Sequence, residues 1–105
     1  AMSHRIVVVD DNVDLVDSLV SVLEHLGHQA VGATGGADGV ELIDERRPDV
    51  ALIDVGMPGM SGFDVVGQIR RRPWGHGMVL IALTGWGGGE DQDLCRDAGF
   101  DHVAL

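Results

Sequence analysis

The hydrophobic residues of this chain form continuous runs that are separated by stretches with helical spacing. The runs are IVVV at 6–9, VALI at 50–53 and MVLIAL at 78–83, and a weaker run is HQAVGA at 28–33. Continuous apolar runs are typical of strands that are buried on both faces of a parallel sheet. We therefore predict three buried strands, and we place the weaker run at an edge of the sheet.

The best-defined helix is predicted over residues 13–26. Asn12 is a suitable N-cap, and Gly27 is a suitable residue just beyond the C-terminal end. The apolar residues of this segment recur at helical spacing, which places them on one face of the helix. They are Leu15, Val16, Leu19, Val20, Leu23 and Leu26.

Three further helices are predicted over about 36–47, 62–72 and 90–98, and the first two stop before Pro48 and Pro73. The helix over 62–72 is expected to bury Phe63, Val66 and Ile69. The last helix has the fewest apolar residues and should be the least firmly held. Those residues are Leu94, Cys95 and Ala98.

The last five residues, DHVAL at 101–105, read as a fifth strand, so strands and helices alternate along the chain. The connections have the length of right-handed crossovers between parallel strands. The pattern predicts an α/β fold with a doubly wound parallel sheet. A chain of 105 residues with 45% hydrophobic content can bury one core, so we expect a single domain over 1–105.

Charge and composition narrow the class of function. Seventeen acidic residues face seven arginines and no lysine, which gives a formal net charge of -10. This charge disfavours direct binding of nucleic acid or anionic membranes and favours cations or basic partners. No run reaches the roughly 18 apolar residues of a membrane helix, and the N-terminus lacks a secretory signal pattern. We therefore expect a cytoplasmic domain without membrane contact.

The residues that usually bind zinc are poorly placed in this chain. Cys95 is the only cysteine, so neither a disulfide framework nor a thiolate zinc site is available. The five histidines show no ligand spacing, because His25 and His28 lie on either side of Gly27, where a helix should stop. We therefore expect the histidines to be surface residues.

Polar side chains follow each of the three buried runs. Asp10 and Asp11 follow the first run, Asp54 follows the second, and Thr84 follows the third. In a doubly wound parallel sheet the carboxyl ends of the strands open on one edge, where ligands bind. We therefore expect three carboxylates and one hydroxyl in one small cleft.

Each of these residues also has a simpler interpretation. An Asp pair before a helix can cap it and is favoured by the helix dipole, and an Asp or Thr at a strand end is a common turn former. The convergence favours a ligand site, because close carboxylates repel by about 4 kcal/mol per pair at intermediate dielectric. Without a lysine to neutralise them, a hard divalent cation such as Mg²⁺ suits this oxygen-rich cluster best.

A cation held by carboxylates with open positions is half of a phosphoryl-transfer site. Asp54 is placed to attack, and Thr84 can donate its hydroxyl to the incoming group. The glycine-rich segments GMPGMSG at 56–62 and TGWGGGED at 84–91 leave backbone N–H groups accessible to an anion, although the second could also be merely flexible. Neither segment matches a P-loop or a GxGxxG motif.

An ordered set of three segments resembles the receiver domain of two-component response regulators. The segments are VVVDDN at 7–12, ALIDVGMPGMSGFDVV at 51–66 and IALTGWGGGEDQDLCRDAGFDHVAL at 81–105. The resemblance covers the chain from about Arg5 and implies a flavodoxin-like (βα)5 sheet with strand order 2-1-3-4-5. The segments TGWG at 84–87 and AGFDH at 98–102 most resemble those of receivers that are attached to hybrid sensor histidine kinases.

The resemblance implies a role for each residue at the strand ends. Asp54 is expected to be the phosphoacceptor, and Thr84 the switch hydroxyl that moves toward the phosphoryl group. Asp11 is expected to bind Mg²⁺ directly and Asp10 through water. Gly56 is expected to contribute its backbone carbonyl, and Asp54 would contact the ion as well.

The implied function is a phosphoacceptor switch of a two-component or phosphorelay system. A phosphohistidine of a histidine kinase or a histidine phosphotransfer domain would donate its phosphoryl group to Asp54, with Mg²⁺ as cofactor. The domain would catalyse only its own phosphorylation and dephosphorylation, and an output domain could lie in the same or another chain. The added charge would change a surface near the helix over 90–98 and the fifth strand.

This chain departs from the family pattern in two respects. The family carries a Lys just after the fifth strand and then a last helix, and both are absent before the chain ends at Leu105. We expect that the chain is cut short of the native domain, the alternative being a degenerate receiver that lacks one catalytic group. Val103 stands where many members carry an aromatic residue, so we expect switching to run through Thr84, Trp86 and the helix over 90–98.

Two alternative functions stay open at this point. A pseudo-receiver would bind partner proteins without being phosphorylated. A Mg²⁺-dependent phosphohydrolase with an Asp nucleophile needs DxDx[TV] after the first strand and a later Lys, whereas this chain has DDNVD at 10–14 and no Lys.

Overall fold

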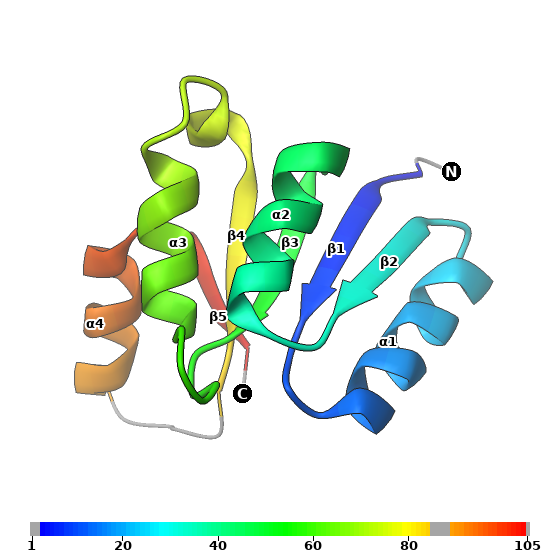
Figure 1. Cartoon of the computed structure of the whole chain (residues 1–105), viewed down its shortest axis with the longest axis horizontal. Helices are drawn as coiled ribbons and strands as arrows, with labels where there is room; N and C mark the ends of the chain where they lie inside the picture. Colours follow the sequence, from blue (N-terminus) through cyan, green and yellow to red (C-terminus); the bar gives the residue numbers. More distant parts are fainter. Residues whose placement is uncertain (1–2, 85–88, 105) are drawn as a thin grey trace.

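A computed structural model describes residues 3–84 and 89–104 and shows a five-stranded parallel sheet flanked by helices (Figure 1). The strand order is β2-β1-β3-β4-β5, and every neighbouring pair is parallel. The doubly wound fold class and the strand order that the sequence predicts are confirmed. The strands are β1 (Arg5–Val9), β2 (Gln29–Ala33), β3 (Val50–Asp54), β4 (Val79–Leu83) and β5 (His102–Ala104).

The helices lie close to their predicted positions. A short 3₁₀ helix between α3 and β4 was not predicted from the sequence. None of the helices in the described ranges is long and apolar enough to cross a membrane. The elements are α1 (Val13–His25), α2 (Gly36–Arg46), α3 (Gly62–Arg70), η1 (Gly75–Gly77) and α4 (Gly89–Ala98).

Successive residues of β1 point to opposite faces of the sheet, because side chains alternate along a strand. Val7 and Val9 belong to a large core cluster that the helices α2, α3 and α4 cover. Ile6 and Val8 belong to a smaller cluster that α1 covers (Figure 1). The two faces of the central strands are therefore both apolar, as the continuous hydrophobic runs predict.

Local signals at the helix ends act as the sequence indicates. The side chain of Asn12 accepts a hydrogen bond of 3.1 Å from the amide of Leu15 and so caps α1. Gly27 follows this helix with a φ of 97°, a conformation that glycine adopts without strain. Ser61 and Asp64 form a reciprocal capping box at the start of α3. These caps fix where the helices begin beside the carboxyl edge of the sheet.

Some burial predictions are wrong. Of the apolar face predicted for α1, only Val16 is buried, while Leu15 is 38% exposed and Leu26 is 65% exposed. Leu94 of α4 is 55% exposed, whereas its neighbour Cys95 is fully buried. The physical reason is that a single helix packed on a sheet buries only the side chains that point directly at the strands.

The predicted surface position of the histidines holds for His25, His76 and His102, which are exposed. His4 and His28 are only half-buried, and their rings stack with centroids 5.5 Å apart. The two histidines lie far apart in the sequence and meet at the amino edge of β1 and β2. The spacing of the histidines along the chain does not predict this contact.

Candidate functional site

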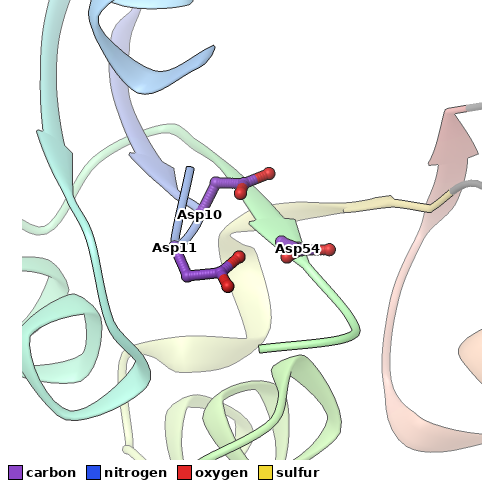
Figure 2. Close-up of side chains that lie close together, drawn as sticks. All are labelled: Asp10, Asp11 and Asp54. Atoms are coloured by element: carbon purple, nitrogen blue, oxygen red, sulfur yellow. The ribbon is translucent and has the colours of Figure 1, made fainter. Parts of the chain in front are cut away.

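Three carboxylates lie together at the carboxyl edge of the sheet, as the strand topology predicts. Asp54 is the last residue of β3, and Asp10 and Asp11 directly follow β1. The two strands are neighbours with Val9 beside Ile53, so their ends come side by side. One ligand atom from each of Asp10, Asp11 and Asp54 lies within 4.8 Å of the others (Figure 2).

Asp10 is the deepest member of the cluster and the buried charged residue of the described chain, with 5% of its surface exposed. Its burial raises the pKa of the carboxyl group. The amide of Asn12 donates a hydrogen bond of 2.9 Å to Oδ1 and lowers this pKa in part, while Asp11 raises it further. The net effect is a raised pKa, which means that the negative charge is poorly compensated here.

The pKa of Asp54 is also raised, and burial is the main cause. The amide of Gly56 donates a hydrogen bond of 3.2 Å to Asp54 Oδ1 and opposes the rise. The negative charges of Asp10 and Asp11 add to it. Each carboxylate of the pair Asp10 and Asp54 therefore makes ionisation of the other less favourable.

The donor set fits a hard divalent cation. All three side chains offer carboxylate oxygens, which are the ligands that Mg²⁺ prefers. Among the described residues, the ion pairs of the arginines are made elsewhere, with Glu45, Asp101 and Asp44. A cation would relieve the repulsion that adds to the effect of burial on the two pKa values, so the electrostatics and the ligand chemistry agree.

Thr84 borders the same site from the next strand. It directly follows β4, whose Leu83 lies beside Asp54 in the sheet register. Its backbone N–H donates a hydrogen bond of 3.2 Å to the carbonyl of Ala104 in β5. Asp10, Asp54 and Thr84 line one groove of about 320 Å³, and Asp11 has a ligand atom within 4.8 Å of those of Asp10 and Asp54.

The groove has an apolar wall that the sequence analysis did not assign to the site. Leu15 and Leu19 of α1 line it, together with Leu83 and Ala104. The signal that could have identified this wall is the width of the apolar face of α1, which exceeds what β1 and β2 alone can cover. An incoming group therefore meets both carboxylates and leucine side chains in this groove.

Gly62 allows α3 to begin against the site. A Cβ atom at this position would lie 2.4 Å from the backbone oxygen of Asp54 and 2.8 Å from the Cα of Val55. The amide of Gly62 donates a hydrogen bond of 3.1 Å to the carbonyl of Val55. A side chain at 62 would therefore displace the backbone that carries Asp54.

Two predicted site features stay predictions. The amide of Gly56 contacts Asp54, while the metal contact predicted for its carbonyl has no counterpart in the described contacts. Trp86, which was expected to take part in switching, lies outside the described residues. The described part of the predicted site thus consists of Asp10, Asp11, Asp54, Gly56 and Thr84.

Comparisons with known proteins point to one family. The family model described as response regulator receiver domain matches residues 6–104. Protein PilH of Pseudomonas aeruginosa is 42% identical over 80 residues, a match that covers 76% of this chain and 66% of PilH. The matched part thus spans slightly less than two thirds of that relative.

Solved structures share the fold. The chemotaxis protein CheY4 of Vibrio cholerae has a TM-score of 0.92 at 24% sequence identity, over 100% of this chain and 87% of CheY4. A CheY-like response regulator receiver domain protein from Methanospirillum hungatei has a TM-score of 0.84 at 29% identity, over 97% of this chain and 80% of that protein.

Proposed function

This chain belongs to the response regulator receiver domain family, and from that premise we propose that it is a signalling switch whose Asp54 accepts a phosphoryl group from a phosphohistidine of a partner protein. One observation carries the proposal. Asp10 and Asp54 line one groove with Thr84, and a ligand atom of Asp11 lies within 4.8 Å of theirs, so the proposed nucleophile, cation ligands and hydroxyl donor lie close together. The partner would be a histidine kinase or a histidine phosphotransfer domain.

Asp54 would act as the nucleophile of an in-line transfer. Its Oδ1 accepts the amide hydrogen of Gly56, which helps to orient the carboxylate, and one carboxylate oxygen would attack the phosphorus atom. A bond forms between this oxygen and phosphorus while the bond between phosphorus and the imidazole nitrogen breaks. The electron pair of the broken bond stays on the nitrogen of the partner's histidine, and the product on this chain is an acyl phosphate.

Asp10, Asp11 and Asp54 would hold Mg²⁺, and we assign Asp11 and Asp54 as direct ligands and Asp10 as a ligand through water. The backbone carbonyl of Gly56 would complete the protein ligands. When bound, the ion supplies positive charge that offsets the repulsion between carboxylates and phosphoryl oxygens. The carboxylates of this chain do the positioning, because Asp10 is held by the amide of Asn12 and Asp54 by the amide of Gly56.

Thr84 would respond to the new charge. Phosphorylation adds roughly one further unit of negative charge and several acceptor oxygens, and the Thr84 hydroxyl can donate to one of them. The amide of Thr84 is bonded to the carbonyl of Ala104. A displacement of Thr84 is therefore transmitted directly to β5, and an output domain or another chain can recognise the altered surface of α4 and β5.

The proposal is tested by incubating the chain with a small phosphodonor such as acetyl phosphate and Mg²⁺, and by locating the adduct with mass spectrometry. We expect one stable label on Asp54 and none in Asp54→Asn, with Asp17→Asn as a control that removes one exposed charge elsewhere. Continuous consumption of the donor without a label indicates a phosphohydrolase instead. If neither a label nor turnover occurs, the chain is a pseudo-receiver and the proposal is wrong.

A further inference from the structure

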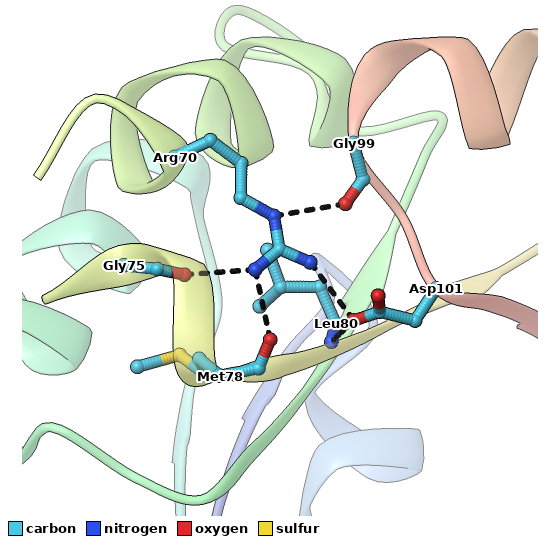
Figure 3. A network of polar contacts seen from close by, with 6 residues as sticks. All are labelled: Arg70, Gly75, Met78, Leu80, Gly99 and Asp101. Atoms are coloured by element: carbon cyan, nitrogen blue, oxygen red, sulfur yellow. Dashed lines mark hydrogen bonds and ion pairs between the residues drawn. The ribbon is translucent and has the colours of Figure 1, made fainter.

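Arg70, the last residue of α3, joins three separate segments through its guanidinium group (Figure 3). Its Nε donates to the carbonyl of Gly99 at 2.9 Å, and its Nη2 donates to the carboxylate of Asp101 at 2.8 Å. Its Nη1 donates to the carbonyls of Gly75 and Met78, both at 2.8 Å. We call these five residues the Arg70 clasp.

Asp101 extends the clasp to the start of β4. The oxygen that accepts from Arg70 also accepts the amide hydrogen of Leu80 at 2.8 Å (Figure 3). The amide of Asp101 in turn donates to the carbonyl of Leu80 at 2.8 Å. The Arg70 side chain is only 18% exposed, so water competes weakly for its bonds to the three backbone carbonyls, whereas the Asp101 side chain is 43% exposed.

The turn between α4 and β5 is shaped around the Arg70 side chain. Gly99 has a φ of +122°, and a Cβ atom there would lie 3.1 Å from Cγ of Arg70 and 3.2 Å from Cγ1 of Val66. On either side of this turn residue, Cys95 and Phe100 are buried in the large core cluster. The C-terminal end of α4 is therefore held by apolar packing and by the arginine together.

The clasp and the phosphoacceptor site lie at opposite edges of the sheet. Thr84 follows the carboxyl end of β4, at the carboxylate cluster, whereas Met78 and Leu80 lie at the amino end of the same strand. Because α4 connects β4 to the parallel strand β5, it runs from the edge with the site back to the edge with the clasp. The N-terminal end of α4 thus lies at the edge of the sheet that carries Thr84, and its C-terminal end lies at the Arg70 clasp.

We propose that Arg70 is a positioning residue that fixes the C-terminal end of α4, so that a change at Thr84 tilts this helix about residues 99–101. The helix then does not shift as a whole. The change at Thr84 in this inference rests on the proposed function, whereas the contacts of Arg70 are present in the unphosphorylated chain. The surface that changes is the half of α4 nearer the site, while the Arg70 clasp keeps its contacts.

The anchor is tested by amide hydrogen exchange of Arg70→Met, with Arg72→Met as the matched control. Arg72 lies near the same end of α3 and makes a two-pronged ion pair with Asp44, both bonds 2.9 Å long. The hydrogen bonds of its side chain within the described residues are with α2 and, through the carbonyl of Gln68, with α3. We expect exchange at Leu80 and at residues 99–101 to become about tenfold faster in Arg70→Met, because charge-assisted hydrogen bonds are lost. Equal exchange at these amides in both variants overturns the proposal.

The tilt is tested by adding beryllofluoride and Mg²⁺ to the full chain and mapping backbone NMR shifts. In the unchanged chain we expect the shifts along α4 to fade before residue 99, while the end of β5 responds separately through the hydrogen bond between Thr84 and Ala104. In Arg70→Met the shifts should extend through 99–101 to Met78. In Arg70→Lys, which keeps a positive charge, the shifts at 99–101 should be smaller than in Arg70→Met. A response that is identical in Arg70→Met and the unchanged chain overturns the tilt while the proposed function stands.

A chain that shows no shifts with beryllofluoride overturns the proposed function, and the tilt fails with it. If Arg70→Met does not fold, Asp101→Asn serves as the second variant. Asn keeps an oxygen for the amide of Leu80 but removes the charge that pairs with Arg70. Amide exchange at 99–101 should be faster than in the unchanged chain, but by less than in Arg70→Met. If both the exchange rates and the NMR shifts of Asp101→Asn equal those of the unchanged chain, the proposal is overturned.

Discussion

The amide of Asn12 donates a hydrogen bond of 2.9 Å to Oδ1 of Asp10, while the side chain of Asn12 caps α1 through the amide of Leu15. Helix capping and the carboxylate cluster are therefore not alternatives at this position. Asn12 begins the helix, and its own amide orients the buried carboxylate. The adjacent Asp11 is exposed and remains accessible to a cation.

Removal of one charge from the cluster should stabilise the metal-free chain. Asp54→Asn keeps the size of the side chain and removes repulsion with Asp10 and Asp11. We expect its free energy of unfolding in EDTA to rise by about 1–2 kcal/mol, or several degrees in Tm. Asp17→Asn, an exposed α1 variant, is the charge-matched control. Thermal melts that show equal Tm values for the two variants contradict this account of the cluster.

The pH dependence of this effect has a defined sign. The pKa of Asp54 is raised above its ordinary value of 3.8, so the unfolded chain loses this proton first as the pH rises. The contribution of the protonated Asp54 carboxyl group to folding stability is therefore present at low pH and is lost as the pH rises through the raised pKa. Urea unfolding in EDTA should therefore show the advantage of Asp54→Asn growing from about pH 4 toward neutral pH and then levelling off.

Asp44 provides the opposite case within the same chain. Its hydrogen bond from Arg72 lowers the pKa of the carboxyl group below 3.8, so its stability contribution is present at neutral pH and is lost as the pH falls through the lowered value. Asp44→Asn should therefore be less stable than the unchanged chain at pH 7 and should approach it in acid. A penalty for Asp44→Asn that is independent of pH refutes this assignment.

The sheet and the carboxylate cluster could be predicted because both follow from local features plus topology. The runs IVVV and VALI define buried strands, and parallel order brings their carboxyl ends together whatever the loops do. Asp10 and Asp54 are 44 residues apart, yet their positions at strand ends suffice to pair them. These positions also indicate a cation site with Asp54 as nucleophile, whereas the separate ligand roles of Asp10, Asp11 and Gly56 are implied only by the family resemblance.

The Arg70 clasp could not be predicted in this way. Its contacts with Gly99 and Asp101 span 29 and 31 residues and depend on how two turns meet in space. A lone arginine at the end of a helix has no periodic pattern that names its partners. The exposure of Leu15 and Leu26 was missed for a related reason, since helical spacing defines an apolar face but not what covers it.

Two glycines of α3 should respond oppositely to the same substitution. In Gly62→Ala the new Cβ meets the backbone of Asp54 and Val55, which cannot move without shifting Asp54, the proposed phosphoacceptor. We expect a loss of about 1–3 kcal/mol and slower labelling of Asp54. Gly67→Ala meets no atom within 4 Å in the helix interior and should stabilise the chain by about 0.5–1 kcal/mol. Urea unfolding and labelling rates compare the two variants, and similar effects exclude the close approach at Gly62 as the cause.

Asp11 should dominate cation binding because it combines exposure with two neighbouring carboxylates. Asp11→Asn removes one charged ligand and should weaken Mg²⁺ binding at least about tenfold in calorimetry, since hard cations are held by charged oxygens. Asp17→Asn lies in α1 outside the cluster and should bind as the unchanged chain does. If both variants bind Mg²⁺ equally well, the ion is not held at Asp10, Asp11 and Asp54.

Thr84 should separate acceptance of the phosphoryl group from its consequence. Thr84→Ala keeps the backbone hydrogen bond to Ala104 but removes the hydroxyl, so Asp54 should still be labelled. The backbone NMR shifts of β5 on addition of beryllofluoride and Mg²⁺ should be largely lost, because nothing pulls this strand end toward the new charge. Thr84→Ser should retain them, and Thr34→Ala, the other threonine, serves as control. Full β5 shifts in Thr84→Ala would mean that the signal reaches this strand by a route other than the hydroxyl.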